Sequence, residues 1–315
     1  MSTPDSQEQL KEEAKSIRLK LDKLLRADDK KALMMRLVCV YAGMITETLI
    51  DYEEPDVVME QAFHRIADLL QTEPAEDDAA EDFMPLASDI DRDTEIGRQL
   101  AQITATRLPK ELDDVHEIAI ALVLDTASAW DEDKPGRDIM LRILAEAVVA
   151  SLTYEMAAQD FCDFLIEDLV TEGFSPGEAI FGLSAVAGSY FAEASYTDAL
   201  DDKAEESLWQ VMAREAVLHG TPGTKNWQPL AASNDTENIR LRAYMETMRP
   251  ETDKFFEMIG LEDSFGQAVA VAKAVGRMVA VVTVEDIGQI HPSIAKSLAK
   301  TGMILGSRYR ADIVH

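Results

Sequence analysis

The residues best suited to chemistry are a few histidines and carboxylates on segments with helical periodicity. Asp113, His116 and Glu117 lie within about one helical turn, and carboxylate and imidazole groups are ordinary metal ligands in helical bundles. The Asp-x-x-His-Glu motif formed by Asp113, His116 and Glu117 occurs once in the sequence, and it begins with aspartate where a di-iron bundle has glutamate. Ile120 occupies the position at which a metalloprotease helix has its second histidine. These three residues are therefore weak candidates for a metal site, and we expect no metal or other cofactor.

Two further carboxylates lie beside strongly apolar runs. A buried carboxylate is costly unless a cation pairs with it, so such a residue is either structural or functional. Arg142 precedes Glu146 by four residues, which predicts an ion pair on one helix face. Asp125 has no base nearby in the sequence, so it is the stronger candidate functional acid. A place on the solvent-facing side of its helix is the alternative for Asp125.

The sequence lacks the signatures of nucleophilic and phosphate-binding enzymes. It contains no Gly-x-Ser-x-Gly elbow, and the turn at 221–225 lacks the glycine spacing of a phosphate loop. Cys39 and Cys162 have apolar neighbours and no adjacent base, which predicts buried, unreactive thiols. Two cysteines without a disulfide framework favour a reducing, cytoplasmic location.

Charge is distributed unevenly along the chain. The net charge is −29, and residues 47–206 carry 40 acidic and 9 basic side chains, whereas the segments on either side are nearly balanced. A field of this sign repels nucleic acid and attracts basic proteins. The acidic run supplies the candidate partner-binding residues Glu76, Asp77, Asp78, Glu81 and Asp82, and the basic tail supplies Arg308 and Arg310. Complementary charge on ends and middle also favours head-to-tail self-association.

Helical periodicity covers nearly the whole chain. It predicts an all-α, multi-helix bundle of about ten to twelve helices, arranged either as two packed subdomains or as an irregular solenoid. Ser175 and Glu178 have the spacing of a capping box. Ser184, Gly188 and Ala192 recur every four residues, which predicts the close approach of another helix.

Composition divides the chain into five segments. We expect an N-terminal helical segment (1–72), an acidic linker (73–91), a central bundle (92–220), a loop (221–235) and a C-terminal helical subdomain (236–315). The segment 137–171 reads as a long helix broken near Gln159, and 236–259 reads as two helices separated at Pro250. Residues 276–284 fit either a helix or a strand, and a helix is favoured because no partner strand is evident.

No uninterrupted apolar run reaches the length of a membrane span. The nearest, from Ala268 to Val284, contains Lys273 and Arg277, which predicts no transmembrane segment. Taken together, these features favour a non-enzymatic, acidic helical interaction or assembly protein that binds a basic protein partner or itself. The alternative is a metal-dependent helical enzyme that uses Asp113, His116 and Glu117.

Overall fold

A computed structural model describes most of the chain. The described residues are 4–25, 30–50, 52, 54–75, 85, 87–107, 112–130, 135–171, 173–198, 202–220, 236–283 and 290–309. Their regular structure consists of eleven helices and no strands. The predicted all-α class and the predicted number of helices are therefore confirmed. The chain divides into two compact units, unit 1 (Met1–Thr153) and unit 2 (Tyr154–His315).

Unit 1 is built around one buried helix. Its helices are α1 (Pro4–Leu24), α2 (Lys30–Leu49), α3 (Pro55–Leu70), α5 (Ala87–Arg107), α6 (Leu112–Trp130) and the first half of α7 (Pro135–Thr171). Every residue of α2 from Leu37 to Leu49 is buried, and α2 packs against α5 and α6. Helix α1 packs against α6, and its residues Ala14, Ile17 and Leu21 belong to the buried core of unit 1.

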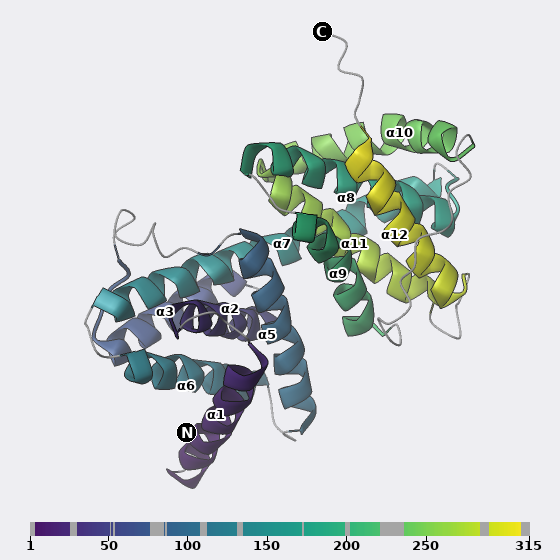
Figure 1. The fold of residues 1–315 in the computed structure, drawn as a ribbon. Helices are drawn as coiled ribbons and strands as arrows, with labels where there is room; N and C mark the ends of the chain where they lie inside the picture. Colours follow the sequence, from purple (N-terminus) through teal and green to yellow (C-terminus); the bar gives the residue numbers. More distant parts are fainter. Residues whose placement is uncertain are drawn as a thin grey trace. The chain divides into compact units, whose positions relative to one another are not determined.

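Unit 2 has the same kind of buried central helix. It contains the rest of α7, followed by α8 (Pro176–Asp198), α9 (Asp202–Leu218), α10 (Thr236–Ile259), α11 (Ser264–Thr283) and α12 (Pro292–Arg308). Helix α11 is buried along most of its length and packs against α8 and α9, and α12 runs alongside α8 (Figure 1). Residues 276–283 belong to α11, which confirms the preference for a helix there.

Glycine allows the closest helix contacts in both units. A methyl group at Gly306 of α12 would overlap the carbonyl of Ala185 in α8, and one at Gly188 would overlap that of Met303. The predicted close approach along the α8 stripe is confirmed at Gly188. In unit 1, Gly43 of α2 meets the backbone of Thr94 in α5 in the same way. Side chains at such positions would force the helix backbones apart.

The start of α8 has the hydrogen bonds of the predicted capping box. The backbone N–H of Ser175 donates to Glu178 Oε2 at 3.0 Å, and the Glu178 N–H donates to Ser175 Oγ at 3.4 Å. Two helix-end donors are thereby satisfied by side chains three residues apart.

Two predicted helix breaks are wrong. Helix α7 continues through Gln159, whose side chain donates to Asp163 one turn later and accepts from Arg277 of α11. Helix α10 continues through Pro250, which is exposed. Met248 and Thr252 are buried on either side of the proline, and this packing holds the helix together although one backbone hydrogen bond is lost.

The expected segment boundaries differ from the division into units. The units separate at Thr153, inside the segment 92–220 that was expected to form one bundle. Helix α5 begins at Ala87, within the expected acidic linker 73–91, of which residues 76–84 lie outside the described part. The expected loop 221–235 also lies outside it.

Two helices, α2 and α11, have the length and apolar composition that a membrane crossing requires. Within the structure, 78% of the apolar window of α2 and 89% of that of α11 are buried. The core helix of a soluble protein has the same properties, so the expectation of no transmembrane segment stays a prediction.

Candidate functional site

His116 and Glu117 of the weak metal motif contact different partners. His116 Nδ1 lies 2.9 Å from the hydroxyl of Thr48, and Arg65 donates to both carboxylate oxygens of Glu117. Asp113 belongs to α6, but its side chain lies outside the described part. Among the described side chains, no group of three histidines, cysteines or carboxylates is placed to hold a metal ion. The metal-enzyme alternative stays a prediction.

Asp125 and Glu146 both form ion pairs. Asp125 of α6 pairs with Arg18 of α1, which is 107 residues earlier in the sequence, and both side chains are half-buried. Glu146 Oε1 lies 2.6 Å from an Arg142 guanidinium nitrogen, as the four-residue spacing predicts. In the structure each acid therefore links or stabilises helices of unit 1.

Most of the candidate partner-binding residues lie outside the part of the chain that the structure describes. Glu76, Asp77, Asp78, Glu81, Asp82 and Arg310 lie outside the described residues. Arg308 is exposed in the last turn of α12.

A buried cluster of charged residues in unit 2 was not singled out from the sequence. Three helices each contribute two polar residues spaced by four positions, so that both face the same neighbours. The residues are Glu155 and Gln159 on α7, Glu215 and His219 on α9, and Lys273 and Arg277 on α11. The signal in the sequence was the pair of bases inside the apolar run 268–284.

The four charges of this cluster form a closed ring. Arg277 donates through Nε to Glu215 Oε1 at 2.9 Å and through another nitrogen to Glu155 Oε1. Lys273 Nζ lies 3.6 Å from Glu155 Oε2 and 3.7 Å from Glu215 Oε2. Each of the four carboxylate oxygens thus faces one cation, and all four side chains are buried. Two acids and two bases compensate each other, so the ring is neutral and structural.

Two groups lie at the edge of the charged ring. His219 Nε2 lies 3.1 Å from Glu215 Oε1, and its side chain is partly exposed. The Cys162 thiol lies near the carbonyl of Ala274, and burial together with the negative charge of Glu215 raises the pKa of Cys162 to about 12. A thiol with so high a pKa is a poor nucleophile at neutral pH, which agrees with its expected structural role.

Unit 1 contains a second buried set of ion pairs, between α2 and α5. Arg98 Nε donates to Glu47 Oε2 at 2.8 Å, and Gln102 donates to the other oxygen at 2.7 Å. Asp93 accepts two hydrogen bonds of 3.0 Å from Arg36 and two from Arg92. These contacts lie beside the close approach at Gly43, so polar and backbone packing fix the same helix pair.

An exposed surface of unit 2 combines apolar and acidic side chains. Phe164 of α7 is 50% exposed, and its ring centroid lies 6.1 Å from that of the buried Phe255 of α10. Met258 and Ile259 follow Phe255 by three and four residues on α10, and they are 65% and 37% exposed. We define the acidic–apolar surface as the exposed residues Phe164, Met258 and Ile259 together with four exposed acids, each within four residues of one of them in sequence, which are Asp160, Asp163, Glu257 and Glu262.

The four exposed acids give the acidic–apolar surface a negative electrostatic potential. The last turn of α10 contains no basic residue, so Glu257 adds its charge to the negative end of the helix dipole. The nearest base in the sequence, Lys254, pairs with Glu251 at 2.7 Å. Exposed apolar side chains among acids are suited to a partner that is both apolar and basic.

The chain matches no family model, no curated protein and no solved structure in comparisons with known proteins.

Proposed function

We propose that this chain is a non-enzymatic, acidic helical interaction protein that binds a basic, apolar segment of a protein partner. The acidic–apolar surface of unit 2 is the binding site, and a reducing cytoplasmic compartment is the proposed location. The single observation that carries the proposal is the exposure of Phe164, Met258 and Ile259 beside four exposed carboxylates.

The ion pairs in the interior support a structural role for the buried carboxylates. The buried carboxylates Glu47, Asp93, Glu155 and Glu215 each contact at least one arginine. Carboxylates in such pairs hold helices together and are not open to a substrate or a metal. The acids that remain available to a partner are on the outside.

The chemistry of the surface specifies the partner. Burial of an exposed methionine or phenylalanine contributes about 1.5–3 kcal/mol, whereas exposed charge pairs mainly steer association and set its orientation. The best partner is therefore an amphipathic segment with large apolar residues and lysine or arginine beside them. Nucleic acid has the wrong sign of charge for this surface.

The test is the binding of a fluorescent helical peptide of leucine and lysine, measured by anisotropy at increasing salt. We expect saturable binding that weakens as ionic strength rises, because the rim charges are screened. A peptide with glutamate in place of lysine should not bind. Met258→Ser should weaken binding of the lysine peptide, since the apolar anchor is lost while the charge is unchanged.

A matched pair of variants separates this site from general attraction to a negative protein. Glu257→Lys with Glu262→Lys changes the charge at the surface, and Glu54→Lys with Glu60→Lys makes the same change on exposed residues of unit 1. Only the first pair should abolish binding. Equal losses in both, or no binding by the wild-type protein, would contradict the proposed site.

A further inference from the structure

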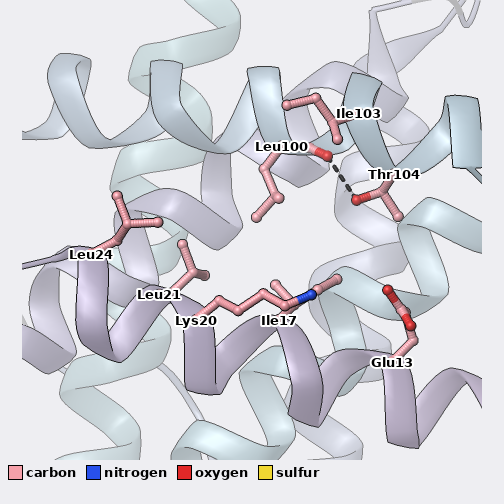
Figure 2. A pocket seen from close by; sticks show the side chains of 8 residues that line it. All are labelled: Glu13, Ile17, Lys20, Leu21, Leu24, Leu100, Ile103 and Thr104. Carbon is pink, nitrogen blue, oxygen red and sulfur yellow. Dashed lines mark hydrogen bonds between the residues drawn. The ribbon is translucent and has the colours of Figure 1, made fainter.

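An apolar cavity lies between α1 and α5 in unit 1. Its volume is about 210 Å³, and Figure 2 shows Leu21 and Leu24 of α1 facing Leu100 and Ile103 of α5 across it. The remaining lining residues are Glu13, Ile17, Lys20 and Thr104. The Thr104 hydroxyl donates to the Leu100 carbonyl, so it offers no free donor to the cavity. A dry cavity of about 150 Å³ holds a benzene-sized group, so this one can accept a large apolar side chain.

The rim of the cavity is exposed and basic at one end. Leu24 is 75% exposed and Ile103 is 47% exposed, so apolar area continues from the cavity onto the surface. Lys20 and Lys23 are exposed on the same helix, and Lys23 lies in its last turn, beside Leu24. Neither lysine forms an ion pair with the described residues.

This cavity and the acidic–apolar surface complement each other. Unit 1 offers an apolar hollow beside two lysines, and unit 2 offers exposed Met258 beside Glu257 and Glu262. Methionine is unbranched and flexible, so it adapts to an irregular hollow. The cavity and the acidic–apolar surface are two different surfaces of the same chain. A head-to-tail contact between copies requires two such complementary surfaces.

We propose that the segment bound by the acidic–apolar surface is helix α1 of a second copy of this chain. Met258 of one copy enters the α1–α5 cavity of the next, and Glu257 and Glu262 lie against Lys20 and Lys23. This inference rests on the proposed function and names its partner. The contact is heterologous, so an open assembly keeps one free cavity at one end and one free surface at the other, and each can bind a further copy.

The first experiment is sedimentation velocity of the full chain over a range of concentrations and salt. We expect the average mass to rise above 34.9 kDa with concentration and to fall again as salt is added. Met258→Ala should weaken association about tenfold or more, since the inserted side chain is lost. Its exposure in the single copy means that this variant should fold normally. A wild-type chain that stays monomeric at every concentration would overturn the inference.

Charge reversal tests the orientation of the contact. Lys20→Glu with Lys23→Glu makes the cavity rim acidic, and Glu257→Lys with Glu262→Lys makes the surface basic. Each double variant alone should remain monomeric, because like charges meet at every junction. An equal mixture of the two should associate again, because every junction between unlike variants joins opposite charges. Failure of the mixture to associate would overturn the pairing.

Lys11→Glu with Lys15→Glu is the matched control. It makes the same charge change on the exposed face of α1 without touching the cavity lining, and it should associate as the wild type does. An equal loss in this control would show that charge alone, and not the cavity, drives association. If the leucine–lysine peptide binds but the chain stays monomeric, only the self-association inference fails, and the proposed function stands.

Discussion

Arg277 Nε lies 2.9 Å from Glu215 Oε1 in the interior of unit 2, and the Glu215 side chain is completely buried. The same guanidinium also contacts Glu155, so one arginine joins α7, α9 and α11. Removal of the Arg277 side chain would therefore leave two buried carboxylates without their arginine partner.

We expect Arg277→Ala to lower the free energy of unfolding by about 3–5 kcal/mol, because it leaves buried carboxylates without their main cation. The measurement is urea unfolding followed by circular dichroism. Arg242→Ala is the matched control, since Arg242 likewise pairs with a glutamate, Glu246, but both side chains of that pair are exposed. Its loss should be about 0.5 kcal/mol or less. Similar effects of both substitutions would show that the buried ring does not stabilise unit 2.

Gly306→Ala should destabilise unit 2 by about 2 kcal/mol or more, because the added methyl overlaps the Ala185 carbonyl of α8. Gly177→Ala serves as the comparison. The new methyl there meets the side-chain ends of Leu298 and Ile290, which can shift, and alanine favours the helix. Thermal unfolding of the two variants should therefore give changes of different size. Tolerance of Gly306→Ala would contradict the backbone contact between α8 and α12.

Both cysteine thiols should resist alkylation in the folded protein. Burial raises the pKa of Cys39 and of Cys162, to about 12 for Cys162. At pH 8 a thiol with a pKa near 12 is ionised in about one molecule in ten thousand, and the thiolate is the reactive form. Iodoacetamide labelling followed by mass spectrometry should find both sites unmodified until denaturant is added. Rapid labelling of native Cys162 would contradict its environment.

Folding stability should fall as pH rises above about 9. In the unfolded chain the Cys162 thiol ionises near its ordinary pKa of 9.0, but in the folded chain it holds its proton to about pH 12. The folded state therefore binds more protons in this window, and stability is lost as pH rises through it. Tyr41 and Tyr190 add to the effect, because burial raises the pKa of each. Urea midpoints at pH 8 and pH 10.5 test this, and Cys162→Ala should reduce the difference.

The helices follow from local patterns, which explains why the sequence predicts most of them. The capping residues Ser175 and Glu178 interact within one turn, and the apolar spacing of α1 matches its buried face. Local rules fail at Pro250, where the burial of Met248 and Thr252 on either side of the proline outweighs the lost hydrogen bond.

The polar contacts depend on residues far apart in sequence, so they escaped prediction. Asp125 has no base close to it in the sequence, and its partner in the structure, Arg18, belongs to a different helix. In the sequence, Lys273 and Arg277 indicated only that their helix does not cross a membrane. Their partners Glu155 and Glu215 become visible only in the fold, because they lie on other helices. The acidic–apolar surface was also hidden, because a sequence does not show that Met258 remains exposed while Phe255, three residues earlier, is buried.

The four charges of the ring in unit 2 sum to zero, and all four side chains are buried. Dissolved ions screen exposed carboxylates strongly but reach such an interior poorly. The proposed binding of a basic partner should therefore weaken when ionic strength rises, while the ion pairs among α7, α9 and α11 keep their strength. If the proposed partner binds, we therefore expect added salt to release it without unfolding unit 2.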